Sequence, residues 1–262
     1  MYIQMIETKV VQKFGNSGHV VLPKGYIGKR IRFIVEPKSF EDIKSEVLVI
    51  LNPYLENILG IYLYGSYARG EQTADSDIDI LVVNNNKLRI IDKMNDYSII
   101  SVTINELEST LNNNAVLVLP IIKEAKIIIN PGLLEKYKEY KFTNENTGWF
   151  IKNSMHALEL NKKGLEFNFE IGSMVYSLML RIRGLLMIKI MLNNSPYSKA
   201  ALFSHLKGSE FKQNKIDELY KIYSREKLGI KVFESKIITK EDISKLLFTA
   251  KNLLKEVQNL LR

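Results

Sequence analysis

The 262-residue chain contains no cysteine, only three histidines and a single tryptophan. Disulfides, zinc–thiolate sites and a cysteine nucleophile are therefore excluded, and three scattered histidines do not favour a histidine-rich metal site. Long apolar runs are also missing, because residues 174–192 are interrupted by Arg181, Arg183 and Lys189, each costly at a bilayer centre. The N-terminus has no basic leader before an apolar core. We therefore expect a cytoplasmic protein with no membrane segment.

The net charge of +8 is distributed unevenly along the chain. Residues 1–38 carry seven basic and two acidic side chains, residues 39–130 seven and thirteen, and residues 131–262 twenty-three and fourteen. An acidic middle between two basic flanks indicates three units, and the basic flanks suit an anionic partner such as nucleic acid or a nucleotide. A lysine-rich solvated surface would give the same charge counts.

The first unit, residues 1–38, is too short to fold alone. Its β-rich runs at 10–11, 19–22 and 31–35 are separated by turn residues, Gly-Asn-Ser-Gly and Pro-Lys-Gly. About 40 residues do not normally bury enough apolar surface without a staple or a partner. We therefore predict a homodimer.

The sequence of this unit also carries a family resemblance. Phe14-Gly15-Asn16-Ser17-Gly18, followed by His19 to Lys24, resembles the swapped-hairpin DNA-binding family of AbrB-like transcription factors. The resemblance implies an interleaved dimer that binds DNA, and a dimerising hairpin without a DNA role is the equal alternative. If DNA is the partner, the candidate phosphate contacts are the basic side chains Lys13, Lys24, Lys29, Arg30 and Arg32.

The rest of the chain divides into an α/β part and a helical part, which together predict an α+β multidomain protein. In residues 39–130 the apolar spacing predicts a helix over 43–58, strands at 61–64, 78–83, 97–104 and 126–129, and helices at 105–111 and 116–125. In residues 131–262 it predicts an antiparallel bundle with helices at 148–162, 171–192, 199–206 and 212–225. Thr239 and Asp242 form a capping box before a final helix.

Residues that could bind phosphate follow the strand predicted at 61–64. The strand ends at Gly65-Ser66, where a glycine lets backbone N–H groups approach an anion closely. The start of the following helix adds its positive end, and Ser66 can donate one more hydrogen bond.

Two carboxylates begin the next strand. Strand alternation places Asp77 and Asp79 on one face, about 7 Å apart, while Ile78 and Ile80 point to the core. Carboxylates so close repel each other unless a cation lies between them. Mg²⁺ (or Mn²⁺) suits this position, because it accepts carboxylate oxygens and shares its coordination with substrate phosphates. The alternative is a surface turn followed by two solvated aspartates.

Together these residues resemble the signature of the DNA polymerase β-like nucleotidyltransferase superfamily, close to its minimal members. Gly65, Ser66, Asp77 and Asp79 match the family pattern, and Arg69-Gly70-Glu71 and Ser76 match the minimal members as well. The resemblance implies that Gly65 and Ser66 hold a nucleoside triphosphate, with ATP expected, and that Asp77 and Asp79 bind Mg²⁺. A nucleoside monophosphate then moves to an acceptor with release of pyrophosphate. Arg69 either contacts phosphate or forms a salt bridge with Glu71 or Asp75.

One family feature is missing from the sequence. The family usually places a third carboxylate on a later strand, but residues 97–104 contain none, and Ser101 or a neighbour occupies its place. Asp96 before the strand and Glu106 after it are the possible substitutes. The general-base step is therefore in question.

The helical part resembles HEPN-like bundles and the C-terminal bundles of antibiotic nucleotidyltransferases. Arg181 and Arg183 interrupt its apolar helix, and either face the cleft to steady an anionic substrate or are paired or snorkelling. The sequence thus predicts a Mg²⁺-dependent nucleotidyltransferase. One alternative is a catalytically weakened, antitoxin-like regulator that binds DNA or a protein. A second is an aminoglycoside-type transferase.

Overall fold

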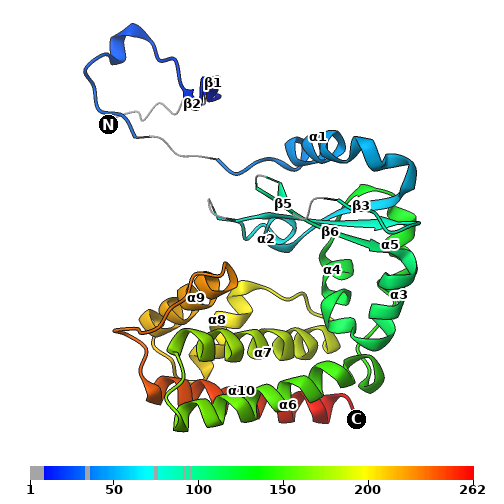
Figure 1. Cartoon of the computed structure of the whole chain (residues 1–262), viewed down its shortest axis with the longest axis vertical. Coiled ribbons are helices and arrows are strands. Elements are labelled where there is room, and N and C mark those ends of the chain that lie inside the picture. The colour runs from blue at the N-terminus through cyan, green and yellow to red at the C-terminus, as the bar shows by residue number, and fades with distance from the viewer. Residues whose placement is uncertain (1–8, 33–35, 74–75, 91–92, 95) are drawn as a thin grey trace. The chain divides into compact units, whose positions relative to one another are not determined.

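The structure, a computed structural model, describes residues 9–32, 36–73, 76–90, 93–94 and 96–262 (Figure 1). It divides into two compact units, Met1–Glu36 and Pro37–Arg262. Each unit is described by itself below.

The N-terminal unit contains one short antiparallel hairpin, β1 (Gln12–Phe14) and β2 (Ser17–His19), followed by a 3₁₀ turn, η1 (Lys24–Tyr26). The second strand begins two residues earlier than predicted, because Ser17 and Gly18 pair with β1 and leave only Gly15 and Asn16 for the turn. The run predicted at 10–11 is irregular, because the first strand begins at Gln12. Residues 20–22 and 31–32 are also irregular, and residues 33–35 of the third predicted strand lie outside the described residues.

This unit has no core of its own in the part of it that the structure describes. Between residues 9 and 32 no residue is buried, and Leu22 alone is partly buried. Large apolar side chains stay in contact with solvent, among them Val10, Phe14, Val21 and Ile27. The hairpin therefore gains little from hydrophobic burial within this unit.

The second unit is built on a five-stranded mixed sheet in the order β5-β6-β4-β3-β7. Its strands are β3 (Ile58–Tyr64), β4 (Ile78–Asn84), β5 (Lys93–Met94), β6 (Tyr97–Thr103) and β7 (Lys126–Ile129). β4 and β6 run parallel, whereas the other neighbours are antiparallel. The four predicted strands are confirmed, and the two-residue strand β5 was not predicted.

Strand alternation sends the two faces of this sheet into different cores. One face packs beneath helix α1 (Phe40–Leu51), in a cluster that includes Ile43, Val47, Leu51, Ile61, Leu63, Ile78, Ile80 and Val82. The helix predicted over 43–58 ends at Leu51, because Pro53 cannot continue it, and Asn52–Asn57 form a 3₁₀ helix instead.

The other face of the sheet joins a core that continues into the helices. Tyr62, Leu81 and Val83 belong to one buried cluster with residues of the helical part, so the two parts separated at residue 130 share a core. The helices are α3 (Ile104–Asn113), α4 (Leu119–Glu124), α5 (Pro131–Lys138), α6 (Asn144–Glu166), α7 (Ile171–Leu192), α8 (Lys199–Gly208), α9 (Gln213–Lys227) and α10 (Lys240–Leu260). A short 3₁₀ turn, η3 (Ala115–Leu117), precedes α4.

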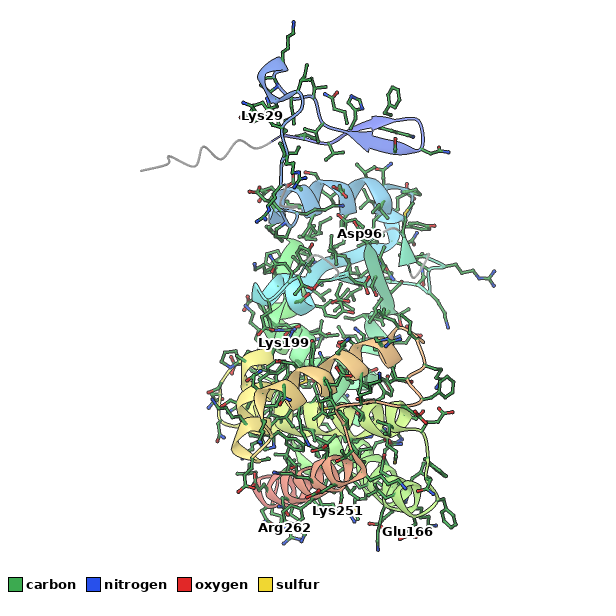
Figure 2. The ribbon with its side chains drawn as sticks, turned by 90° about the vertical axis from the view of Figure 1, so that its left-hand side faces the viewer. Lys29, Asp96, Glu166, Lys199, Lys251 and Arg262 are labelled. Carbon is green, nitrogen blue, oxygen red and sulfur yellow. The ribbon has the colours of Figure 1, made fainter. Side chains whose placement is uncertain are left out.

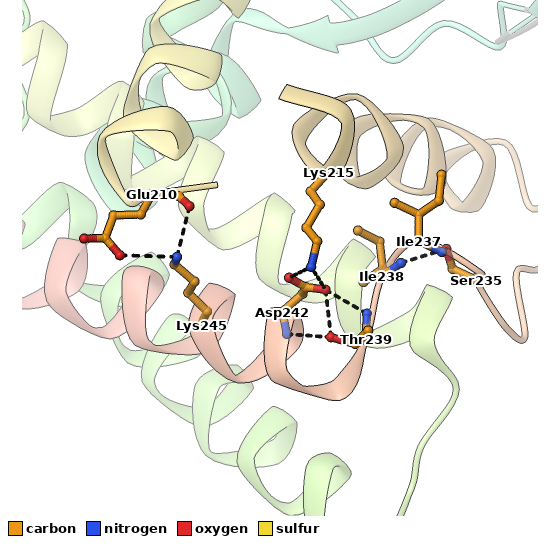
Figure 3. Close-up of polar contacts among 8 residues, drawn as sticks. All are labelled: Glu210, Lys215, Ser235, Ile237, Ile238, Thr239, Asp242 and Lys245. Carbon is orange, nitrogen blue, oxygen red and sulfur yellow. Dashed lines mark hydrogen bonds and ion pairs between the residues drawn. The ribbon is translucent and has the colours of Figure 1, made fainter. Parts of the chain in front are cut away.

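Helices α6, α7 and α10 pack side by side (Figure 1), and α9 packs on α7. None of the helices in the described residues is both long enough and apolar enough to cross a bilayer. The predicted capping box at the start of α10 is confirmed (Figure 3): Thr239 accepts from the Asp242 N–H, and Asp242 accepts from the Thr239 N–H. Lys215 of α9 binds the same carboxylate at 2.5 and 2.7 Å, which ties α9 to α10.

Two helical glycines provide a matched test of this packing. A Cβ at Gly184 of α7 would lie 2.3 Å from Cζ of the buried Phe150 ring, whereas a Cβ at Gly148 of α6 meets nothing within 4 Å. We expect Gly184→Ala to lower the free energy of unfolding by about 1–3 kcal/mol through overpacking. Gly148→Ala should raise it by about 0.5–1 kcal/mol, because alanine favours helix. Urea unfolding of both variants tests this, and equal effects would contradict it.

Candidate active site

A close approach between two strands fixes the centre of the site. β3 ends at Tyr64, whose register partner on β4 is Asp79, and the chain then turns into the short helix α2 (Gly65–Arg69). Gly65 adopts a φ of +76°, and a Cβ there would lie 2.1 Å from Oδ2 of Asp79. Any larger residue would be strained and would collide with the carboxylate, so glycine is required at this position.

Asp77 and Asp79 lie beside this turn, as the sequence predicts. Their neighbours Ile78 and Ile80 are buried on the opposite face of β4. Burial raises the pKa of Asp79 to about 6; Lys227 opposes this shift, and Asp77 adds to it. The shift reflects negative charge that is largely removed from water and close to a second carboxylate.

Both aspartates open onto a cleft of about 680 Å³, which Gly65 and Ser66 also line. Its two walls differ in charge. Every carboxylate among the described lining residues comes from the sheet side, namely Glu71, Asp77, Asp79 and Glu124. The helical side contributes the cations Arg183, Lys199, Lys221, Arg225 and Lys227. This volume and this polarity suit a polyanionic ligand together with a cation.

Aromatic rings contact two of the cations of the helical wall, Arg183 and Lys199. Nη1 of Arg183 donates to the Tyr223 hydroxyl at 3.2 Å, and its guanidinium lies 5.9 Å from the centre of the Tyr197 ring. Nζ of Lys199 lies 4.1 Å from the centre of the Tyr220 ring. Lys199 is located where the helical part meets the sheet (Figure 2).

The two arginines predicted to face substrate therefore differ in position. Arg183 lines the cleft, whereas Arg181 does not. Arg181 lies 5.8 Å over the Phe150 ring, and its buried Nε has no hydrogen-bond partner among the described residues. Burial lowers the pKa of Arg181.

Arg69 forms the salt bridge with Glu71 that the sequence analysis left open, and a second one with Glu124. The other candidate partner, Asp75, lies outside the described residues. Nε of Arg69 donates to Glu71 at 2.8 Å and its Nη1 to Glu124 at 2.7 Å. The other oxygen of Glu124 accepts the Gly65 N–H at 2.8 Å. Glu124 was missed by the sequence analysis. Its one local signal is an acidic residue at the end of a helix, where the dipole disfavours negative charge.

The face of β6 next to Asp79 carries no carboxylate. Ser98 is the register partner of Asp79, and Ile100 lies two residues further along the same face. Ser101 points to the other face, where its hydroxyl accepts from Nδ2 of Asn84 at 2.6 Å. Ser98, rather than Ser101, is therefore the residue of β6 that lies beside Asp79, whereas Ile100 lies beside Leu81.

Neither proposed substitute for the third carboxylate reaches the cleft. Asp96 lies 3.9 Å from Lys38 with 69% of its side chain exposed, and Glu106 caps α3 through Thr103. Neither is among the cleft-lining residues.

The described residues contain no group of three or more acidic or histidine ligands that could hold a metal ion. A pair of carboxylates is nevertheless a sufficient protein contribution for Mg²⁺, which completes its shell with water and substrate phosphates. The partly buried and mutually repelling charges of Asp77 and Asp79 fit such a cation.

Comparison with known proteins agrees with this geometry. Residues 46–131 match the family model "Polymerase beta, Nucleotidyltransferase". The chain therefore carries a nucleotidyltransferase domain of the polymerase β-like superfamily, which confirms the resemblance carried by its Gly-Ser and Asp-x-Asp residues. Residues 3–36 match a second model, "Putative transposon-encoded protein (DUF2080)". The AbrB-like and HEPN-like resemblances stay predictions.

Among individual proteins, the chain is similar to a "Putative protein adenylyltransferase" of Methanocaldococcus jannaschii, with 51% identity over 41 residues. This stretch is 16% of the chain and 41% of the relative, so it spans about two fifths of that protein.

Two solved structures are also similar. A spectinomycin adenyltransferase from Enterococcus faecialis, solved with ATP and spectinomycin, gives a TM-score of 0.44 at 16% identity, covering 84% of this chain and 100% of that one. A nucleotidyltransferase-like protein from Exiguobacterium sibiricum gives 0.36 at 14% identity, covering 84% and 77%.

The raised pKa of Asp79 predicts a pH-dependent cost to stability. A carboxyl whose folded pKa exceeds its unfolded value favours folding while it is protonated, and this contribution is lost as the pH rises through about 6. Without divalent cations, Asp79→Asn should therefore raise the free energy of unfolding at pH 7.5 by on the order of 2 kcal/mol. The gain should vanish near pH 3.5.

Urea unfolding at both pH values measures this difference. Asp217→Asn, on the exposed face of α9, is the matched control and should change little. An Asp79→Asn protein no more stable than the wild type at pH 7.5 would contradict the prediction.

Proposed function

We propose that the protein is a Mg²⁺-dependent nucleotidyltransferase that moves the adenylyl group of ATP to an acceptor and releases pyrophosphate. The observation that carries this proposal is the placement of the Gly65-Ser66 turn against the Asp77–Asp79 pair at one cleft. The match of residues 46–131 to the nucleotidyltransferase family supports it.

Each of these residues has a distinct role in the proposed reaction. The backbone at Gly65-Ser66 and the Ser66 hydroxyl bind the triphosphate, as the family resemblance implies. Asp77 and Asp79 would hold Mg²⁺ (or Mn²⁺), which when bound neutralises phosphate charge and orients the leaving group. The acceptor oxygen attacks the α-phosphorus in line, and the bond to the pyrophosphate oxygen breaks. The cationic helical wall, with Arg183 buried among tyrosines, favours the negative charge that develops.

The charge of the cleft bears on the acceptor. Its carboxylates on the sheet side are committed, because Glu71 and Glu124 pair with Arg69, and Asp77 and Asp79 are assigned to the metal. The opposite wall is cationic and aromatic. A polycationic aminoglycoside would meet no spare carboxylate among the described lining residues. A neutral or anionic acceptor fits better, and the name of the archaeal relative suggests a protein as the acceptor.

Calorimetric titration with α,β-methylene-ATP tests the nucleotide site. We expect binding that needs both Mg²⁺ and the Asp77 carboxylate, with Asp77→Asn weakening it at least tenfold, because removal of one partner leaves the other charge uncompensated. The matched control is Asp96→Asn, which changes an exposed carboxylate outside the cleft. Binding by Asp77→Asn as tight as that of the wild type would refute the metal assignment.

A second proposed activity rests on the N-terminal unit. Its described residues expose apolar side chains, including 70% of Phe14 and 78% of Ile27, together with the basic candidates Lys13, Lys24, Lys29, Arg30 and Arg32. We propose that this unit pairs with that of a second chain and binds DNA phosphates through these cations. If transferase chemistry fails, this activity would leave the protein as a regulator.

Sedimentation and salt-dependent DNA binding test the second activity. We expect Phe14→Asp to weaken dimerisation, because it places a charge in the proposed contact. For Lys24→Ala, the slope of log affinity for duplex DNA against log salt should fall by about one, the effect of one lost phosphate contact. Lys255→Ala, an exposed lysine of α10, should leave the slope unchanged. A wild-type protein that is monomeric and does not bind duplex DNA would overturn the proposal.

A further inference from the structure

A continuous series of polar contacts connects the nucleotide turn to the helical wall. The Gly65 N–H donates to Oε1 of Glu124 at 2.8 Å, and Oε2 of Glu124 accepts from Arg69 at 2.7 Å. Arg69 also donates to Oε2 of Glu71 at 2.8 Å, and Oε1 of Glu71 accepts the backbone N–H of Lys199 at 2.7 Å. The series begins beside Ser66 and ends at the first residue of α8.

These three charged side chains are mostly buried. Exposed fractions are 16% for Arg69, 21% for Glu71 and 17% for Glu124. Ion pairs so far removed from water contribute little net stability, because the cost of desolvation cancels most of their attraction. One guanidinium also bridges two carboxylates, and a lysine ammonium cannot form this bridge with the same geometry. The value of the network therefore lies in the positions it fixes.

Two parts of the cleft are held by this network. At one end, Glu124 orients the Gly65 peptide, the group that lies against Asp79 and directly precedes Ser66. At the other end, Glu71 holds the start of α8, and Arg69 lies 6.0 Å from the centre of the Tyr197 ring. Arg69 also lines the cleft, but both of the side-chain hydrogen bonds that it donates among the described residues, from Nε and from Nη1, go to these two carboxylates.

We propose that Glu124 and Arg69 are positioning residues that set the phosphate-binding geometry of Gly65-Ser66, an inference that rests on the proposed nucleotidyltransferase function. Glu124 acts through the Gly65 peptide, and Arg69 acts through Glu124. Arg69 is accordingly a support of the phosphate turn and not itself a phosphate ligand.

Binding of phosphate and of nucleoside can be measured separately. With Mg²⁺ present, calorimetric competition gives the affinities of inorganic tripolyphosphate and of adenosine. Glu124→Gln and Glu124→Ala should weaken tripolyphosphate binding about tenfold or more, the effect of one charge-assisted contact. Adenosine binding should stay within about twofold, because adenosine lacks the phosphates that the turn is proposed to bind. A general loosening of the fold would weaken both ligands alike. Glu159→Gln, an exposed partner of Lys251, is the matched control.

Lysine substitution separates positioning by Arg69 from direct phosphate binding. Arg69→Lys keeps the charge but not the bridge between two carboxylates, so it should weaken tripolyphosphate binding as much as Arg69→Ala does. Near-complete rescue by lysine would identify Arg69 as a simple phosphate charge and overturn its assigned role.

A double substitution tests whether Glu124 acts through the turn. In a Ser66→Ala background, Glu124→Gln should lose most of its effect on tripolyphosphate binding, because the contact it positions is already missing. Fully additive losses would contradict this coupling.

The wild type distinguishes failure of this inference from failure of the proposed function. If the wild type binds neither α,β-methylene-ATP nor tripolyphosphate with Mg²⁺, the proposed function and the positioning role are both overturned. If it binds both, and a folded Glu124→Gln binds tripolyphosphate equally or more tightly, the positioning role alone is overturned. Thermal melting identifies the folded variants, and Glu124→Gln decides the matter should Glu124→Ala fail to fold.

Discussion

The contact between Gly65 and Asp79 is the constraint on which the site depends. The antiparallel register of β3 and β4 places Tyr64 opposite Asp79, so the residue after Tyr64 must turn directly beside a half-buried carboxylate. Only glycine can make that turn without strain or collision. The same register that builds the core of the sheet therefore brings a phosphate-binding turn and an aspartate pair to one place, and neither could move without shifting the strands beneath it.

Features set by neighbouring residues could be predicted from the sequence, and features set by distant ones could not. The capping box at Thr239 is local, and so is the strand alternation that separates Asp79 from Ile78. Glu124 lies 59 residues beyond Gly65 in the sequence, and no neighbouring residue indicates that its carboxylate accepts the Gly65 N–H. Pro53 could have shortened the helix predicted over 43–58, because the apolar spacing continues past this proline but an α-helix does not.

The helical wall gives a second case, within one helix, in which distant contacts set a feature that the sequence could not predict. Arg181 and Arg183 are two residues apart, and an α-helix turns by about 100° per residue, so the two side chains leave α7 in nearly opposite directions. The apolar character of the helix on all sides gave no face to choose between them. Only the packing against Phe150 and Tyr223 determines that Arg183 enters the cleft and Arg181 does not.

The core shared by the sheet and the bundle also determines how this molecule comes apart. Tyr62, Leu81 and Val83 lie in the same apolar cluster as residues of α6, α7 and α10. Separating the two parts would expose that surface to water at about 25 cal/mol for each Å². Residues 37–262 should thus unfold as one cooperative unit with a single heat-absorption peak. A substitution that destabilises the core of the bundle should therefore also destabilise the strand that carries Asp79.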